Sequence, residues 1–445
     1  MDNQSSHDSM MCGMVSEETR TADTRTGMSS TERGTTAQAE PRKAPPARAW
    51  TTRLVVAGIV LSALNLRPAI TSLGALLEEV RDGLGMSGGV AGLLTSVPPL
   101  CFAVFGVTAA RLARRFGPAA VVCAGMAAIT AGLLIRPYAG GTAGFLVFSA
   151  LALMGIAVSN VLMPVIVKRW FPDRVGPMTG LYSMALALGT SAAAAVTVPV
   201  TGALGGDWHA GLVVWAGLAA AAVLPWLPLV RERGTAPAPE PAREPEPAAT
   251  RLRITRSRTA WALAVFFGLQ ATAAYITMGW MAQIFRDAGV AAGTAGLLLA
   301  VTMVMGVPLA FVIPRIAARL PHQGPIVLVL GLCGLAGYAG LYLAPAGGAW
   351  AWAILLGVSN CAFPLALTMV GMRARTGPGV AQLSAFAQST GYLISVPGPL
   401  LVGVLYQHSG GWGLPIALMA ALMVPQMAVG VLAGRDRTVE DEAAR

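Results

Sequence analysis

Twelve apolar stretches of membrane-spanning length constrain this chain more than any other feature. An α-helix needs about 20 apolar residues to cross the hydrocarbon core of a bilayer. In hydrocarbon every backbone N–H and C=O group must be bonded within the protein, and a helix achieves this within one segment. We therefore predict an all-α membrane protein with twelve transmembrane helices in two pseudo-symmetric six-helix bundles. The stretches cover residues 54–77, 90–110, 118–136, 143–167, 177–203 and 209–230, and then 260–284, 292–314, 325–344, 349–372, 380–406 and 412–434.

The composition excludes an ordinary soluble domain, because 55% of the 445 residues are hydrophobic and only 12% are charged. A net charge of +10 would suggest nucleic acid as the partner of a soluble protein. In a membrane protein it reflects basic cytoplasmic loops. We therefore expect the lipid bilayer as a partner, no nucleic acid, and a monomer. The five cysteines form no metal-type pair, so we expect no disulfide, no metal site and no cofactor.

The composition also predicts where the bundles begin and end. The first 50 residues are rich in Ser, Thr, Gly and charge, and they lack the apolar core of a signal peptide. A Pro-rich, charged stretch separates the two sets of six segments and is typical of a linker. The predicted parts are a disordered cytoplasmic tail (1–52), an N-terminal six-helix bundle (53–230), a cytoplasmic linker (231–258), a C-terminal six-helix bundle (259–434) and a second cytoplasmic tail (435–445).

Basic residues predict the orientation. With the N-terminus inside, the inner loops hold seventeen Lys and Arg residues, whereas the outer loops and helix ends hold only Arg81, Arg136 and Arg286. Because basic residues stay on the cytoplasmic side, we predict a multi-pass protein of the cell membrane with both termini in the cytoplasm.

The two halves of the chain repeat each other. Ala91-Gly-Leu-Leu begins one predicted helix and Ala295-Gly-Leu-Leu begins another, at an offset of 204 residues. Arg111 and Arg315, at the ends of the same two helices, keep this offset of 204. Matches in register indicate a parallel duplication of six helices.

One cation lies where the bilayer should exclude charge. Arg67 follows Arg53 by 14 residues, which is about 21 Å along a helix axis and past the middle of the hydrocarbon core. No Asp, Glu or Lys lies in the deep part of any apolar stretch. A buried cation is by default a functional-site hypothesis, and the planar guanidinium suits small oxyanions and cyanate-like anions. The alternatives are a structural cation bonded to helix carbonyls, or a side chain that reaches outward to the polar boundary.

Two duplicated six-helix halves joined by a linker resemble the major facilitator superfamily. Its loop signature, G-x-x-x-D-R-x-G-R-K/R, corresponds here to Arg111-Leu-Ala-Arg-Arg-Phe-Gly117, in which Arg114 replaces the acidic residue. More narrowly, residues 53–434 are similar to the cyanate permease family, which includes 2-nitroimidazole transporters. That narrower resemblance also depends on Asn65-Leu-Arg-Pro-Ala-Ile-Thr71, Phe171-Pro-Asp-Arg-Val-Gly-Pro-Met-Thr-Gly-Leu-Tyr182 and Ala387-Gln388-Ser-Thr-Gly-Tyr392.

The resemblance implies which helices line the substrate cavity: helices 1, 4, 7 and 10, with contributions from 5, 8 and 11. Deep polar residues of these helices are therefore candidates for substrate binding. Each amide and tyrosine among them has an alternative role in interhelical packing or at the membrane interface. The candidates are Arg67, Asn65, Thr71, Asn160, Tyr182, Gln270, Tyr275, Asn360, Gln388 and Tyr392.

The first predicted helix ends with two acidic residues, Glu78 and Glu79, beside Arg81. They could form an outer gate or a protonation site. A solvated helix end is the reading that we favour from sequence.

The predicted function is transport of a small monovalent anion, cyanate-like or a small carboxylate, by alternating access. The transporter is secondary active or facilitative. No deep carboxylate or histidine is present to relay a proton, which leaves facilitated diffusion, anion exchange, or symport in which the proton travels on the substrate as its conjugate acid. One alternative is a major facilitator exporter of nitroimidazole-like or other small drugs, which predicts an aromatic pocket. A membrane enzyme would need an embedded nucleophile and base or metal ligands, so we expect no enzyme. A sensor without transport activity is the remaining alternative.

Overall fold

The computed structural model describes residues 49–231 and 254–443, and nearly all of these residues are helical. Within these ranges, eleven helical spans are long and apolar enough to cross a membrane. The twelfth crossing is shorter and consists of α8 (Trp208–Val223) followed by α9 (Trp226–Arg231). The predicted all-α membrane architecture is therefore confirmed. The predicted tail 1–52 and linker 231–258 lie largely outside the described residues.

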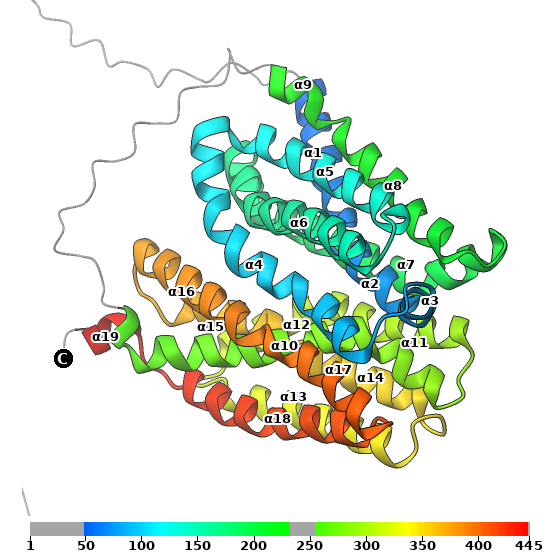
Figure 1. The fold of residues 1–445 in the computed structure, drawn as a ribbon. Helices are drawn as coiled ribbons and strands as arrows, with labels where there is room; N and C mark the ends of the chain where they lie inside the picture. Colours follow the sequence, from blue (N-terminus) through cyan, green and yellow to red (C-terminus); the bar gives the residue numbers. More distant parts are fainter. Residues whose placement is uncertain (1–48, 232–253, 444–445) are drawn as a thin grey trace, which may run out of the picture. The chain divides into compact units, whose positions relative to one another are not determined.

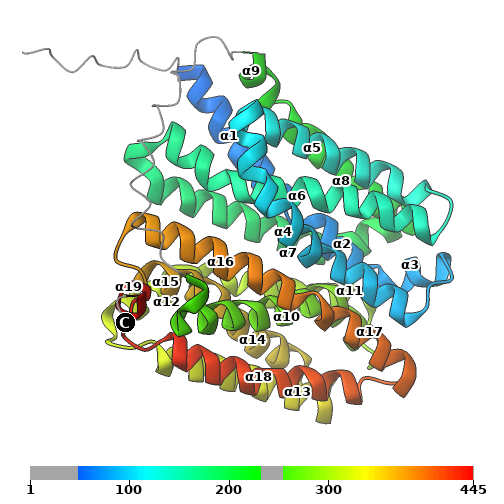
Figure 2. The same cartoon turned by 60° about the vertical axis from the view of Figure 1, so that its left-hand side comes forward.

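The crossings of each bundle follow one another with short connections (Figures 1 and 2). The first bundle contains α1 (Ala49–Asn65), α2 (Pro68–Ala75), α3 (Leu77–Gly83), α4 (Gly88–Phe116), α5 (Pro118–Ile135), η1 (Arg136–Tyr138), α6 (Thr142–Trp170), η2 (Pro172–Arg174), α7 (Val175–Ala203), α8 and α9. The second contains η4 (Ile254–Arg256), α10 (Arg258–Asp287), α11 (Ala292–Val304), α12 (Gly306–Arg319), α13 (Gly324–Leu343), α14 (Ala349–Asn360), α15 (Ala362–Met372), α16 (Gly377–Ser395), α17 (Pro397–Ser409), α18 (Gly413–Ala433) and α19 (Val439–Ala443).

Several crossings are divided into two helices at or near a proline. A proline has no N–H group, and its ring clashes with the carbonyl four residues earlier. The α1–α2 break precedes Pro68 directly, and the α16–α17 break precedes Pro397. The α11–α12 and α14–α15 breaks lie three residues before Pro308 and Pro364. In the first break the chain turns at Arg67, which lies between the end of α1 and the start of α2.

Glycines let the two bundles touch backbone to backbone on one face, where α4 packs on α17 and α7 packs on α11. A Cβ atom on Gly74 of α2 would lie 2.0 Å from the Met278 carbonyl oxygen of α10. A Cβ atom on Gly403 of α17 would lie 2.4 Å from the Gly88 carbonyl oxygen of α4. Only glycine permits these approaches, as is common where membrane helices cross closely.

Polar contacts between the bundles gather on this same face. We name it the far face, because it lies opposite the linker face, where α9 ends and α10 begins. Arg286 of α10 pairs with Glu78 and Glu79 of α3, each at 2.9 Å. The Gly89 N–H donates to Gln407 Oε1 at 2.9 Å. The two glutamates, expected from sequence to form a solvated helix end, thus bind a cation of the other bundle, and the far face is closed.

The last helix, α19, lies within the predicted tail 435–445 and is anchored to the second bundle. Glu442 accepts hydrogen bonds from Ser257 Oγ at 2.6 Å and from the Thr259 N–H at 3.1 Å. The Val439 N–H donates to the Arg373 carbonyl oxygen. Burial raises the pKa of Glu442, but these donors lower it, and the net pKa lies below its usual value. The carboxylate therefore caps the start of α10.

Candidate functional site

Arg67 lies between the two bundles and has no ion-pair partner among the described residues. Its side chain is partly exposed, and its Nη1 atom lies 3.5 Å from the hydroxyl oxygen of Tyr275 in α10. The guanidinium carbon lies 5.6 Å from the ring centroid of Phe102 in α4 and 5.9 Å from that of Tyr275. Aromatic faces attract such a cation without neutralising it. The guanidinium is thus held in place with its charge uncompensated.

The aromatic rings near Arg67 come from both bundles. Phe102 stacks on Tyr392 of α16 with centroids 5.0 Å apart, and Tyr275 lies 6.5 Å from each of them. Phe267 of α10 meets the edge of Tyr392 at 5.2 Å and contacts Phe363 of α15 at 5.6 Å. Sequence analysis predicted Tyr275 and Tyr392 as site residues but missed Phe102. That ring lies on the second crossing, outside the helices that the resemblance pointed to, and no local signal distinguishes it.

In the first bundle, two more predicted residues lie together. The Tyr182 hydroxyl of α7 donates to Asn160 Oδ1 of α6 at 2.7 Å, and both side chains are partly exposed. Tyr182 also lies within coulombic range of the Arg67 guanidinium. These two residues therefore belong to the surroundings of Arg67.

Asn65 and Thr71, on either side of the α1–α2 break, donate to backbone carbonyl oxygens. The Asn65 amide is 1% exposed and donates to the Leu61 carbonyl oxygen at 2.8 Å and to that of Leu218 in α8 at 3.1 Å. The Thr71 hydroxyl is fully buried and donates to the Arg67 carbonyl oxygen at 3.3 Å. The Asn65 amide thus bonds to backbone of its own helix and of α8, and the Thr71 hydroxyl bonds to a carbonyl oxygen that also accepts from the Ile70 and Thr71 N–H groups.

The predicted amides of the second bundle bond to one another. Gln270 Nε2 donates to Asn360 Oδ1 at 2.8 Å and to the Asn360 carbonyl oxygen at 3.0 Å. Gln426 Nε2 of α18 donates to Gln270 Oε1 at 3.0 Å. This chain of amides joins α10, α14 and α18, as interhelical hydrogen bonds do in membrane proteins. Gln388 bonds locally, from its Nε2 to Ser384 Oγ at 2.8 Å.

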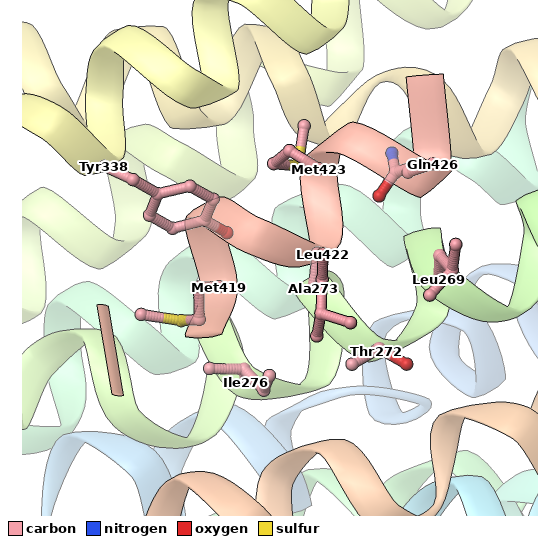
Figure 3. Close-up of a pocket in the computed structure, with 9 residues that line it drawn as sticks. All are labelled: Leu269, Thr272, Ala273, Ile276, Tyr338, Met419, Leu422, Met423 and Gln426. Carbon is pink, nitrogen blue, oxygen red and sulfur yellow. The ribbon is translucent and has the colours of Figure 1, made fainter. Parts of the chain in front are cut away.

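A small pocket lies beside this amide network (Figure 3). Its walls come from α10, α13 and α18 and are mostly apolar, with Gln426, Thr272 and Tyr338 as polar members. It contains no charged side chain, so the pocket is unsuited to an anion. Its lining consists of Leu269, Thr272, Ala273, Ile276, Tyr338, Met419, Leu422, Met423 and Gln426.

We expect Gln426→Leu to lower the unfolding temperature and to leave the Michaelis constant for transport unchanged. The substitution removes the donor to Gln270 Oε1 in a buried position, at a cost of about 1–3 kcal/mol. Thermal unfolding of the purified protein and uptake kinetics in proteoliposomes measure the two effects. A raised Michaelis constant with normal stability would place the network in the substrate site.

Together, Arg67 and its neighbours can hold a small anion. The guanidinium supplies several N–H donors and a permanent charge, and tyrosine hydroxyls supply further donors. In the part of the chain that the structure describes, no cluster of three or more His, Cys, Asp or Glu side chains could hold a metal ion. Binding at this site would draw on both bundles, because Arg67 belongs to one and Tyr275 to the other.

Comparisons with known proteins agree with this architecture. The profile of the Major Facilitator Superfamily matches residues 56–377. The uncharacterized transporter YycB of Bacillus subtilis (strain 168) is 35% identical over 390 residues, covering 86% of this chain and 94% of YycB. The 2-nitroimidazole transporter of Escherichia coli (strain K12) is 32% identical, covering 87% of this chain and 96% of that protein.

A third relative and one solved structure complete the comparison. The cyanate transport protein CynX of Escherichia coli (strain K12) is 30% identical over 373 residues, covering 83% of this chain and 94% of CynX. The crystal structure of a mutant of the nucleoside transporter NupG superposes with a TM-score of 0.69 at 13% identity, covering 86% of this chain and 99% of NupG. The structural likeness at this identity concerns the fold alone.

Proposed function

The chain belongs to the major facilitator superfamily of transporters, and we propose that its cargo is a small monovalent anion anchored by Arg67. Cyanate-like ions and small carboxylates fit this class. The observation that carries the proposal is the guanidinium of Arg67, which is partly exposed between the bundles and lacks a carboxylate partner among the described residues. A cation without a counter-charge in a membrane-spanning segment is costly, and a bound anion would offset that cost.

The relatives support this class of cargo. One relative is named as a cyanate transport protein, and cyanate is a small anion with a single negative charge. One guanidinium matches one negative charge and would leave a divalent anion half-neutralised in a low-dielectric site. Sulfate should therefore bind much more weakly than cyanate, formate or acetate.

Alternating access follows from the placement of the site between two bundles. The far face is closed by glycine contacts and by the Arg286 ion pairs, which leaves release and entry of cargo to the linker face in this state. We propose that the linker face is cytoplasmic and that the protein resides in the cell membrane, because the linker and inner loops carry most of the basic residues.

A second candidate cargo is a nitroimidazole-like planar molecule. The aromatic cluster of Phe102, Tyr275 and Tyr392 beside Arg67 favours it, because aromatic side chains pack well against flat aromatic molecules. A nitro group could also accept hydrogen bonds from Arg67. A relative is named as a 2-nitroimidazole transporter, so this cargo is tested alongside the anions.

Flux measurements in proteoliposomes decide between the two. We expect saturable uptake of labelled formate, acetate and cyanate, with mutual competition among them, and much weaker competition by sulfate and 2-nitroimidazole. Protein-free liposomes give the background. Saturable 2-nitroimidazole flux that small anions do not inhibit, without anion flux above background, would replace the anion proposal with the drug exporter.

A further inference from the structure

A second guanidinium lies buried in the first bundle without a charge partner. Arg136 begins η1, at the end of α5, and is 2% exposed. Its Nη1 atom donates to the Ala69 carbonyl oxygen of α2 at 3.1 Å. Its Nε and Nη2 atoms have no hydrogen-bond partner in the structure. No carboxylate within the described ranges pairs with it, and the nearest compensation is the face of Phe145 at 5.7 Å.

An unpaired buried cation is far more costly than a buried neutral group. Native proteins leave few buried donors unbonded, and each such donor requires an explanation such as an ion or a water that binds there. Arg136 leaves two donors unbonded on the same charged group. The sequence had placed this residue at the outer end of a helix, where solvent would satisfy it, whereas the structure buries it.

The unpaired donors of Arg136 belong to a group that lines a small pocket. Ser149 of α6 lines the same pocket, is 1% exposed, and its hydroxyl also lacks a partner. The remaining walls come from α2, α4, α6 and α10 and are largely apolar. The free space accommodates about one water molecule or an ion of similar size. A charged and a neutral donor thus share a space that fits one small acceptor.

The pocket lies next to the Arg67 site but is separate from it. Tyr275 lines the pocket and also contacts Arg67. The wall contributed by α2 begins at Ala69 and continues to Gly74, which places the pocket on the far-face side of Arg67. The α10 residues that line the pocket are Tyr275 and Gly279, so residues of both bundles enclose it.

We propose that this pocket binds a monovalent inorganic anion of about the size of chloride, held by Arg136 and the Ser149 hydroxyl. A halide accepts several hydrogen bonds and neutralises the guanidinium at the same time. A water molecule could accept from these donors but would leave the charge uncompensated. Because the site has its own donors, halide binding there does not depend on which cargo Arg67 takes.

Thermal unfolding with a halide series tests the site. The full-length protein in detergent is transferred to gluconate and titrated with chloride or bromide at constant ionic strength. A ligand that binds only the folded state raises the unfolding temperature with its concentration. We expect a saturable rise for both halides in the wild type, whereas sulfate of matched ionic strength should give only the non-saturating stabilisation of an excluded salt.

Substitutions test whether the halide that stabilises the protein binds in this pocket. In Arg136→Gln we expect the halide concentration for half-maximal stabilisation to rise at least about tenfold, and in Ser149→Ala to rise by a smaller factor. Arg67→Gln is the matched control, since it removes the neighbouring guanidinium that also lacks an ion-pair partner and should leave the halide effect intact. If Arg136→Gln fails to fold, Ser149→Ala and an anomalous bromide signal beside Arg136 in wild-type crystals test the site directly.

Three results would overturn the proposal. The first is a wild-type protein whose stability does not respond to halide. The second is a halide effect that persists in Arg136→Gln and disappears in Arg67→Gln, which would assign the halide to the transport site. The third is a crystal soaked in bromide that shows only a water in the pocket. A wild-type protein that transports no small anion but keeps the halide effect would instead refute the proposed cargo. The proposal for the Arg136 pocket would not be affected by that result.

Discussion

Replacing Arg67 by alanine is expected to lower kcat/KM for anion uptake at least about 30-fold, because truncating a buried charged partner costs about 2 kcal/mol or more. The variant removes the charge that lies between the bundles and the hydrogen bond to Tyr275. Without this charge the site offers only neutral donors to an anion that has lost its water. Uptake of labelled formate or acetate into proteoliposomes measures the effect.

Arg67→Lys separates charge from geometry. Lysine keeps one positive charge but lacks the planar fork, and an ammonium group is more strongly hydrated. We expect an intermediate loss of uptake. Tyr275→Phe is the matched control, because it keeps the ring beside Arg67 and removes only the hydroxyl; we expect a smaller loss than with Arg67→Ala. Full activity in both Arg67→Ala and Arg67→Lys would exclude Arg67 from the mechanism.

Gly74→Ala is expected to shift the protein away from the state closed at the far face. A Cβ atom at this position would lie 2.0 Å from the Met278 carbonyl oxygen, so α2 and α10 must separate. Overpacking of this kind costs about 1–3 kcal/mol, which changes a two-state population ratio roughly 5- to 150-fold. The cost falls on the closed arrangement, in which these helices touch.

Distance distributions between spin labels at Asp82 and Ser409, on opposite bundles of the far face, measure this shift. The labels are placed in a variant without native cysteines. We expect longer distances and reduced uptake for Gly74→Ala. The control is Gly293→Ala in α11, where a Cβ atom meets nothing within 4 Å; alanine there should stabilise the helix by up to about 1 kcal/mol. Unchanged distances and uptake in Gly74→Ala would contradict the assigned role of the contact.

Several elements of the site could be predicted from sequence because they depend on depth in the membrane. Arg67 was identified as a lone charge in an apolar stretch. The structure places Arg67 at a helix break before Pro68 and brings Tyr275 to its guanidinium, with Tyr182 and Tyr392 near enough to interact with the charge. Whether these residues bind cargo stays a prediction.

Other residues show what sequence could not decide. Gln270 and Asn360 have the same local pattern whether they face a cavity or each other, and the structure shows them bonded together. Arg136 lies at a helix end in the sequence, but in the structure it is buried at the start of η1 and donates a hydrogen bond to the Ala69 carbonyl oxygen of α2. Glu78 and Glu79 were expected to form a solvated helix end, but the structure shows ion pairs between them and Arg286 of the other half of the chain.

The sequence by itself determined the membrane-spanning segments and their grouping into two related halves. Segment length, hydropathy and repeat spacing are properties of neighbouring residues, and the bilayer imposes strict limits on them. The tertiary structure alone decided which polar groups meet, where glycines allow contact and which face is closed. Arg67 and Tyr275 are 208 positions apart, and a contact over that separation is set by how whole helices pack.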